Sequence, residues 1–277
     1  MSQGPSAAER WRRDLESWAI PEEVLRAAPE SPYGFPADLF ARSTAQALSR
    51  PEETPSRRAA LEALGRGGSV LDVGCGAGAA SLPLAPPAKE LVGVDESPEM
   101  LALFAQGAQA RGVTHREVQG RWPEVAGSAP QADVVVCHHV VYNVADLVPF
   151  LDALTHHAKR RVVLELTARH PQSELNGLWL AIHGIRRPER PTATDAVAVA
   201  EEMGLRLHVE QFEAPSLWDT QPLEERVAFA RRRLCVGPER DGEIARWLKE
   251  AGDRPRQLVA AWWDTGRAPE STQAPRH

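Results

Sequence analysis

The chain contains 277 residues, of which 43% are hydrophobic, so it can form one large domain or a domain with an appendage, and a folded rather than a disordered chain is expected. Its formal net charge of −6 gives no overall basic field, so nucleic acid is not an expected partner. Three scattered cysteines lack the spacing of a disulfide framework or a zinc site. With no apolar signal segment and no run long enough to span a bilayer, we expect a cytoplasmic protein with no metal and no membrane partner.

Residues 1–57 predict a helical cap in front of the main domain. Apolar spacing favours an interrupted helix from about residue 7 to 28 and a further helix over residues 38–48. The proline-rich loop between them carries Tyr33 and Phe35. These two aromatic side chains either pack the cap onto the main domain or form a lid over a substrate, and the sequence leaves both interpretations open.

Strand and helix patterns then alternate through residues 58–215, which we expect to form the main domain. After a short helix over residues 58–64, the predicted strands cover residues 69–73, 91–95, 116–119, 134–137 and 161–166, and the predicted helices cover residues 78–84, 98–111 and 146–157. This alternation predicts an α/β fold in which helices cover both faces of a parallel sheet. The unbroken apolar runs at residues 134–136 and 162–164 are typical of strands buried on both faces.

The closing part of the chain predicts more helices and two further strands. Helices are expected over residues 176–185, 194–203, 222–234 and 241–251, and strands over residues 206–213 and 257–263. We expect residues 216–277 to hold a charged helical insert, the final strand and a flexible tail. Since the two closing strands lack the usual crossover of parallel strands, the last strand is expected to be reversed.

Two groups of arginines accompany these elements. We interpret Arg186, Arg187 and Arg190 as a solvated surface run in a proline-bearing loop. The three arginines at residues 231–233 lie among acidic residues of a predicted helix, where pairing within the helix is the simplest interpretation.

The most informative segment is Val70–Gly78, an apolar strand that carries one acid and ends in a glycine-rich turn. Glycine lets the backbone turn tightly and approach a ligand, and a predicted helix with free N–H groups follows. A second apolar strand ends in Asp95, about twenty residues beyond the turn, where doubly wound folds bind ribose hydroxyls. Together they predict a nucleotide-type cofactor site, and the glycine spacing alone also fits NAD.

Asp72 distinguishes these cofactors. The segment from Asp72 to Gly78 reads Asp-Val-Gly-Cys-Gly-Ala-Gly and resembles the first motif of the class I S-adenosylmethionine-dependent methyltransferases, an acid, any residue, then Gly-x-Gly-x-Gly. The resemblance implies a Rossmann-like, seven-stranded sheet that is mostly parallel with an antiparallel last strand. It also implies S-adenosylmethionine as the cofactor and S-adenosylhomocysteine as its product. It covers residues 60–170 well and the closing strands loosely.

The same resemblance implies a set of cofactor-binding residues. The acid that matches Asp72 lies near the amino-acid end of the cofactor, and the acid that matches Asp95 holds the ribose. The other implied residues are Gly74, Cys75, Gly76, Gly78, Glu96, Met100, Gly120, Arg121, Trp122 and Cys137. Family members carry Gly-Asp after the third strand, and this Asp binds the adenine amino group, whereas Gly120 precedes Arg121, which has no acceptor. Trp122 either stacks on adenine or packs in the core.

His138 and His139 follow the fourth predicted strand, where class I enzymes face the sulfonium and the acceptor. Imidazole accepts protons near neutral pH, so either is a candidate general base, and strand alternation points only one of them into the pocket. Both can equally be structural histidines with hydrogen-bond partners. His170, after the fifth strand, is a second candidate base or substrate contact, and Arg169 is a candidate anchor for an acidic substrate.

The sequence therefore predicts a methyltransferase that uses S-adenosylmethionine to methylate an oxygen or nitrogen of a small molecule by SN2-like transfer. No Asn/Asp-Pro-Pro-Tyr/Phe motif follows the fourth strand and no basic tail extends the core, which disfavours nucleic-acid methylation. An RNA methyltransferase and a catalytically silent, S-adenosylmethionine-binding regulatory protein are the alternatives. The sequence leaves the acceptor and the oligomeric state open.

Overall fold

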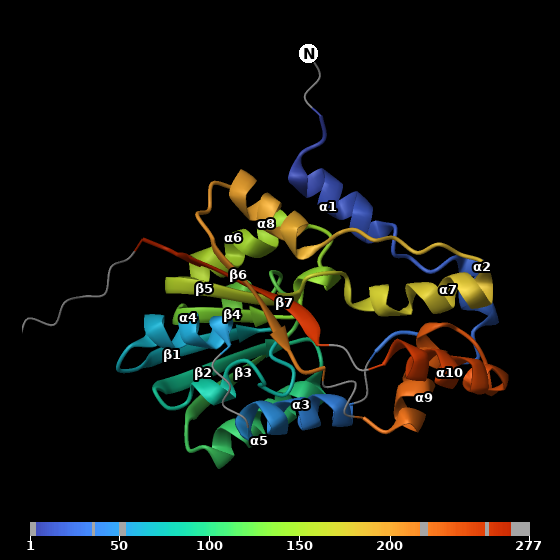
Figure 1. The fold of residues 1–277 in the computed structure, drawn as a ribbon. Helices are drawn as coiled ribbons and strands as arrows, with labels where there is room; N and C mark the ends of the chain where they lie inside the picture. Colours follow the sequence, from blue (N-terminus) through green and yellow to red (C-terminus); the bar gives the residue numbers. More distant parts are fainter. Residues whose placement is uncertain (1–3, 35–36, 50–53, 217–220, 253–254, 267–277) are drawn as a thin grey trace, which may run out of the picture.

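The computed structural model describes residues 4–34, 37–49, 54–216, 221–252 and 255–266. A sheet of seven strands runs through the described part, in the order β3-β2-β1-β4-β5-β7-β6 (Figure 1). The strands are β1 (Gly68–Val73), β2 (Ala88–Asp95), β3 (Thr114–Gln119), β4 (Ala132–His138), β5 (Ala158–Thr167), β6 (His208–Ala214) and β7 (Arg256–Asp264). Strands β1 to β5 pair in parallel, and β7 pairs antiparallel with both β5 and β6, which confirms the predicted mixed sheet with a reversed last strand.

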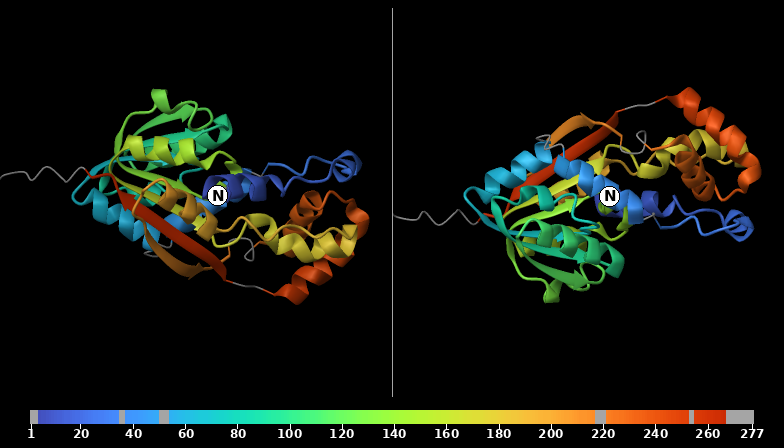
Figure 2. Two further views of the ribbon diagram at one scale, coloured as in Figure 1. Left: turned by 90° about the horizontal axis from the view of Figure 1, so that it is seen from above. Right: turned by 90° about the horizontal axis from the view of Figure 1, so that it is seen from below.

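Both faces of the central strands are buried, because side chains alternate between two apolar clusters. On β4, Val134 and Val136 join the cluster on one face, whereas Val135 and Cys137 join the cluster on the other. The first face is covered by α4 (Pro55–Leu64) and α5 (Pro98–Ala110), and α3 (Ala37–Ser49) lies beside α5. The opposite face is covered by α1 (Ala7–Glu16), α6 (Leu147–His157) and α8 (Ala193–Glu202) (Figures 1 and 2). The unbroken valine and leucine runs therefore predicted this double burial correctly.

One predicted helix is wrong. After the glycine turn, residues 78–84 form turns and a short 3₁₀ segment, η1 (Leu82–Leu84), rather than an α-helix. Gly78 has a φ of +87°, which no right-handed helix adopts, and Pro83 lacks the N–H that an α-helix needs. The side chain of Leu82 fills the space in front of Gly78, so this segment is fixed by packing instead of by helical hydrogen bonds.

A third apolar cluster lies beyond the end of the sheet and defines what we call the side lobe: α2 (Glu22–Ala27), α7 (Asn176–His183), α9 (Leu223–Arg233) and α10 (Asp241–Ala251) (Figures 1 and 2). Leu178 and Trp179 of α7 pack with Val227 of α9 and Leu248 of α10, and Val24 of α2 covers them. Three segments that are far apart in the sequence therefore build one apolar body beside the sheet.

Arginine side chains tie the N-terminal segment to this lobe, so the interpretation of both arginine groups needs correction. The guanidinium of Arg187 lies between the rings of Trp18 and Trp179, 5.5 and 4.8 Å from their centroids, and it donates to the Ala19 carbonyl. Arg187 is thus half-buried, because two aromatic faces and main-chain carbonyls attract a planar cation more strongly than solvent does.

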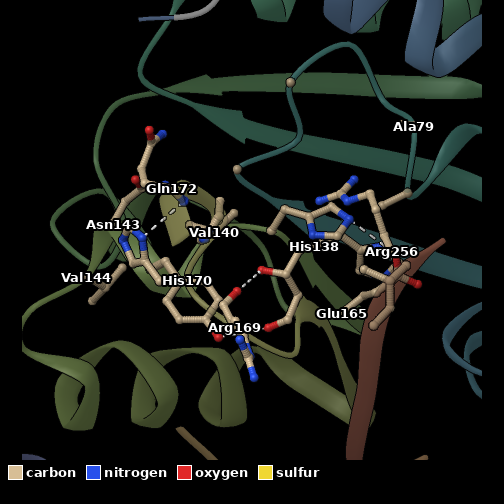
Figure 3. Close-up of a pocket in the computed structure, with 18 of the residues that line it drawn as sticks. Ala79, His138, Val140, Asn143, Val144, Glu165, Arg169, His170, Gln172 and Arg256 are labelled. Atoms are coloured by element: carbon tan, nitrogen blue, oxygen red, sulfur yellow. Dashed lines mark hydrogen bonds and ion pairs between the residues drawn. The ribbon is translucent and has the colours of Figure 1, made fainter. Parts of the chain in front are cut away.

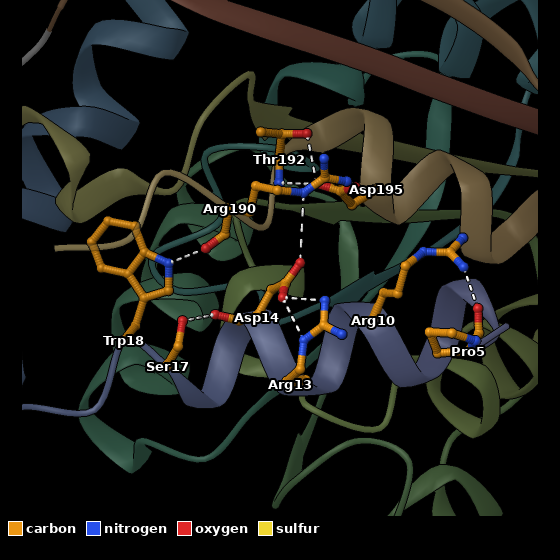
Figure 4. A network of polar contacts seen from close by, with 9 residues as sticks. All are labelled: Pro5, Arg10, Arg13, Asp14, Ser17, Trp18, Arg190, Thr192 and Asp195. Carbon is orange, nitrogen blue, oxygen red and sulfur yellow. Dashed lines mark hydrogen bonds and ion pairs between the residues drawn. The ribbon is translucent and has the colours of Figure 1, made fainter.

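Arg190 also binds the N-terminal segment. Its side chain pairs with Asp14 of α1 and Asp195 of α8, and its carbonyl accepts a hydrogen bond of 2.6 Å from the indole N–H of Trp18 (Figure 4). Arg186 and Arg190 both stay exposed as expected, although Arg190 makes these contacts, whereas Arg187 is half-buried.

On α9 the arginines reach across the lobe rather than along their own helix. Arg231 pairs with Asp241 at 2.8 Å, Arg232 donates to the Gly34 carbonyl, and Arg233 donates to the carbonyls of Pro32 and Gly34. The expected pairing within the helix is therefore wrong, because main-chain carbonyls of the loop before α3 are close enough to compete with the helical carboxylates.

Candidate functional site

The carboxyl ends of β1, β2, β4 and β5 open into one large cavity of about 2240 Å³. Its walls come from the glycine turn, from the segments after β4 and β5, and from the side lobe through Phe229, Trp247 and Leu248. Pockets for drug-sized ligands measure about 300–1,000 Å³, so this cavity has room for two such molecules side by side. In Figure 3, His138, Glu165 and Arg256 lie in one part of the pocket, and Asn143, His170 and Gln172 in another.

The turn after β1 places main chain along the cavity wall. Gly74 and Gly76 have φ angles of +71° and +50°, which glycine adopts without penalty. The amides of Gly74 and Cys75 both donate to the carbonyl of Val94, which fixes the turn against the end of β2. A Cβ at Gly74 would overlap a methyl group of Val140, so no other residue fits there.

Asp95 ends β2 next to this turn and faces the cavity. Its Oδ2 accepts a hydrogen bond of 2.9 Å from the amide of Gly76, and its Oδ1 accepts one of 2.9 Å from the amide of Ser97. Each carboxylate oxygen has a second lone pair, so Asp95 can still accept hydrogen bonds from a ligand. The carboxylate thus connects the glycine turn to the start of α5.

Asp72 lies behind the turn, buried within β1. Burial is the main reason that the pKa of Asp72 is raised to about 7. The Ser81 hydroxyl lowers this pKa, and the Asp95 carboxylate raises it further. Ser81 donates a hydrogen bond of 2.6 Å to Oδ2, whereas Oδ1 is buried and has no partner within the described residues. Together with Gly78 and Cys137, Asp72 does not line the cavity, so these three residues lie outside its wall.

The remaining residues that the resemblance implied lie along one side of the cavity. Glu96 and Arg121 form an exposed ion pair at 2.6 Å, and Met100 is buried at the start of α5. Trp122 lines the cavity while its ring meets that of His157 edge-on in the core cluster, and its buried indole N–H has no partner within the described residues. Gly120 has a φ of +143°, which lets the chain turn sharply between β3 and Arg121.

Both histidines after β4 line the cavity, but their surroundings differ. Nε2 of His138 is buried without a partner in the described part of the chain, and burial lowers the pKa of His138. His139 is exposed and has a φ of +60°, which is unusual for a residue other than glycine. Its Nε2 lies 3.3 Å from Oε1 of Glu165, and its amide donates to the Glu165 carbonyl at 2.7 Å.

Glu165 is a site residue that the sequence analysis missed. It lies near the end of β5 and is only 9% exposed. Its carboxylate accepts a hydrogen bond from the hydroxyl of Ser56 in α4. Burial alone would raise the pKa of Glu165, but the two imidazoles and the Ser56 hydroxyl together lower it to about 2. The signal was a single acid within the apolar run Val-Val-Leu-Glu-Leu, the same pattern that drew attention to Asp72.

The other predicted substrate residues lie in different surroundings. His170 stacks on Trp18 with ring centroids 3.8 Å apart, and burial, helped by Arg187, lowers the pKa of His170 to about 3. It lines the cavity as a neutral imidazole, and its Nδ1 accepts from the Gln172 amide, so the ring nitrogen facing that amide has no free lone pair. Tyr33 is 60% exposed, and Phe35 lies outside the described residues.

Metal binding and membrane spanning find no support in the described residues. The part of the chain that the structure describes contains no group of three His, Cys, Asp or Glu side chains able to hold a metal ion. Its three cysteines are free and buried. None of its described helices combines the length and the apolar character needed to cross a membrane.

Known proteins resemble the core of this chain. Residues 70–161 match the model of the methyltransferase domain family. The chain is 38% identical over 86 residues to the ubiquinone biosynthesis O-methyltransferase of Azorhizobium caulinodans. This aligned segment covers 31% of this chain and 34% of that protein. The matched segments span between 31% and 56% of the length of the curated relatives, so the likeness concerns the core and not the whole of those proteins.

Solved structures extend the likeness to most of the fold. The YcgJ protein of Bacillus subtilis superposes with a TM-score of 0.51 at 18% identity, covering 76% of this chain and 97% of its own. A putative methyltransferase of Bacillus halodurans superposes with a TM-score of 0.54 at 16% identity, covering 78% of this chain and 99% of its own. At such low identity these structures establish the fold alone.

The sheet order, the reversed β7 and the glycine turn at the end of β1 define the class I methyltransferase fold. With the match over residues 70–161, this part of the chain is similar to the methyltransferase domain family, and the chain has the class I methyltransferase fold.

Proposed function

We propose that this protein transfers a methyl group from S-adenosylmethionine to an oxygen or nitrogen of a small molecule. The observation that carries this proposal is the single cavity that joins the glycine turn and Asp95 to the histidines after β4. A donor held at the turn and an acceptor beside the histidines would share one space, which in-line transfer requires.

The residues present fit S-adenosylmethionine. The turn exposes main chain at Gly74 and Gly76 without side chains in the way, and Asp95 keeps lone pairs for ribose hydroxyls. Met100 offers an apolar surface to a purine, and Trp122 an aromatic one. The remaining cofactor-binding residues that we propose are those on the same wall and behind it, Asp72, Cys75, Gly78, Glu96, Gly120, Arg121 and Cys137.

Arg121 departs from the family pattern without closing the pocket. Its guanidinium pairs with Glu96 at 2.6 Å, and both side chains are exposed at the cavity wall, so the arginine is not a buried charge without a partner. A main-chain carbonyl is the acceptor left for an adenine amino group on this side, since arginine offers none.

S-adenosylmethionine would supply an activated methyl group, so the protein itself needs to position the acceptor and, where the acceptor carries a proton, to remove it. In the step, the acceptor atom forms its bond to the methyl carbon while the carbon–sulfur bond breaks, the sulfur keeps the electron pair, and the acceptor proton passes to a base. His139 and His138 line the cavity and are the candidate bases.

The cavity wall favours a small molecule over RNA. Among its described residues are eight acidic side chains and five arginines, so the wall is net acidic and would repel a phosphate backbone. Apolar side chains of the side lobe close the far wall, as is usual for small-molecule sites.

Calorimetry and methyl transfer test the proposal. We expect S-adenosylhomocysteine to bind, and D95A to weaken it about tenfold or more, because the ribose loses an ionised acceptor. Asp152→Ala changes an exposed aspartate of α6 outside the cavity and serves as the matched control.

Radioactive methyl transfer to a panel of phenols, amines and carboxylic acids, with total RNA as a separate arm, then identifies the acceptor. Label in RNA that depends on the protein would favour the RNA alternative. Tight S-adenosylhomocysteine binding without transfer to any arm would favour a silent binding protein.

A further inference from the structure

The strongest unassigned feature of the cavity is the contact between a surface histidine and a buried glutamate. Glu165 belongs to β5 and His139 directly follows β4, and the pairing of β4 with β5 brings their main chains together at the cavity wall. The amide of His139 donates to the carbonyl of Glu165, while Nε2 of His139 lies 3.3 Å from Oε1 of Glu165. Glu165 thus contacts both the main chain and the imidazole ring of His139.

The backbone of His139 shows that this arrangement is imposed by its surroundings. Its φ of +60° places a non-glycine residue in the left-handed region, which costs about 1 kcal/mol and is retained where neighbouring contacts demand it. The turn at His139 is what carries its ring out of the strand and onto the cavity wall. His138, still within β4, keeps its Nε2 buried and without a partner among the described residues.

Glu165 is itself held from its other side. The hydroxyl of Ser56, fully buried at the start of α4, donates to Oε2 of Glu165, and Ser56 lies 2.9 Å from the hydroxyl of Thr54, which caps this helix. The carboxylate therefore has one oxygen bound by the helix and one directed at His139. Because the pKa of Glu165 is lowered to about 2, it remains ionised at every pH at which the protein would work.

We infer that Glu165 is the positioning residue of the methyltransferase site: it holds a proton on Nε2 of His139, and Nδ1 of His139 then accepts the proton of the methyl acceptor. This inference rests on the proposed function, and it selects His139 over His138 as the base. The acceptor oxygen or nitrogen loses its proton to Nδ1 as its new bond to the methyl carbon forms, and the resulting imidazolium is stabilised by the Glu165 carboxylate. The proton later returns to solvent through the exposed ring.

Two charged or titratable groups interact with His139, namely Glu165 of β5 and His138 of β4. A third group, Arg256 of β7, lies in the same part of the pocket as Glu165 and His138 (Figure 3). Only Glu165 is negative, so its removal is expected to have a larger effect on the imidazolium than any other substitution among these three.

Nitrogen NMR of ¹⁵N-histidine-labelled protein with S-adenosylhomocysteine tests the inference without an acceptor. The His139 signals are assigned by their loss in His139→Asn. We expect wild-type His139 to carry its proton on Nε2 when neutral. E165Q should move the neutral ring toward the form protonated on Nδ1, because the carboxylate that faces Nε2 is lost. Ser56→Ala should produce a smaller change in the same direction. Glu62→Gln, an exposed acid of α4 outside the cavity, is the matched control.

A wild-type ring protonated on Nδ1 when neutral, or a ring whose proton position E165Q leaves unchanged, would overturn the inference. With an acceptor found by the panel, E165Q should lower kcat about tenfold or more, while E165D restores part of the activity and of the Nε2-protonated form. Unaltered S-adenosylhomocysteine affinity in E165Q separates this outcome from failure of the proposed function, in which the wild type itself would neither bind nor transfer.

Discussion

Asp72 makes the stability of the ligand-free protein depend on pH in a way that one substitution can reveal. Its carboxyl is buried, one oxygen has no partner within the described residues, and its pKa is raised from 3.8 to about 7. In the unfolded chain this group ionises near its ordinary value, whereas in the folded protein it stays protonated up to about pH 7. Between these values the folded state binds more protons, so stability falls as pH rises.

The magnitude follows from the two pKa values. Between pH 5 and pH 8, the ionisation of Asp72 alone is expected to remove about 2–3 kcal/mol from the free energy of unfolding. Asp72→Asn cannot ionise, so relative to wild type it should gain this amount between the two pH values, while groups that titrate in both proteins cancel. Urea denaturation at pH 5 and pH 8, without ligand, measures the difference.

Two outcomes decide the matter. If the difference in stability between Asp72→Asn and wild type is the same at both pH values, Asp72 titrates alike in the folded and unfolded states and the reasoning about its burial is refuted. Ser81→Ala provides a second check. It removes a hydrogen bond that favours the ionised carboxylate, so the stability of this variant should fall more between pH 5 and pH 8 than that of the wild type.

Other predictions concern the turn and the side lobe. Gly74→Ala should destabilise the protein by about 2–4 kcal/mol in urea denaturation, since its methyl group would overlap Val140 and its φ is positive. Gly65→Ala, with a similar φ and open space, should lose only about 1 kcal/mol, and equal losses would contradict the overlap. Arg187→Ala should destabilise by about 2 kcal/mol and speed hydrogen exchange in α2, because two ring contacts and hydrogen bonds to main-chain carbonyls are lost. The exposed Arg186→Ala should change neither measurement.

The sequence predicts the central sheet closely because strands buried on both faces leave an unmistakable apolar run. The strand predicted at residues 134–137 lies inside the observed β4, and the last strand is reversed as expected. The error at residues 78–84 has a local cause. Pro83 lacks the N–H that an α-helix needs and Gly78 adopts a positive φ, so these two residues prevent an α-helix in this segment.

Partners that are distant in sequence were beyond prediction. A lone acid such as Glu165 signals a buried carboxylate, but nothing nearby indicates that its partner is Ser56, 109 residues earlier. Likewise, periodicity predicts α9 and α10 as helices, yet their packing against α2 depends on contacts that span most of the chain. The glycine turn is built from consecutive residues and could be read from the sequence, whereas the contacts of Glu165 could not.

The position of β7 has a consequence for the order in which the sheet is completed. This strand follows the other six along the chain, yet it lies between β5 and β6 and supplies all the described pairing of β6. During synthesis, the first five strands can assemble, with the glycine turn and Asp95 in place, while β5 still presents an open edge. A chain that stops before residue 256 would therefore keep these five strands but leave one edge of β5 open and β6 unpaired, and aggregation rather than simple loss of activity is its expected fate.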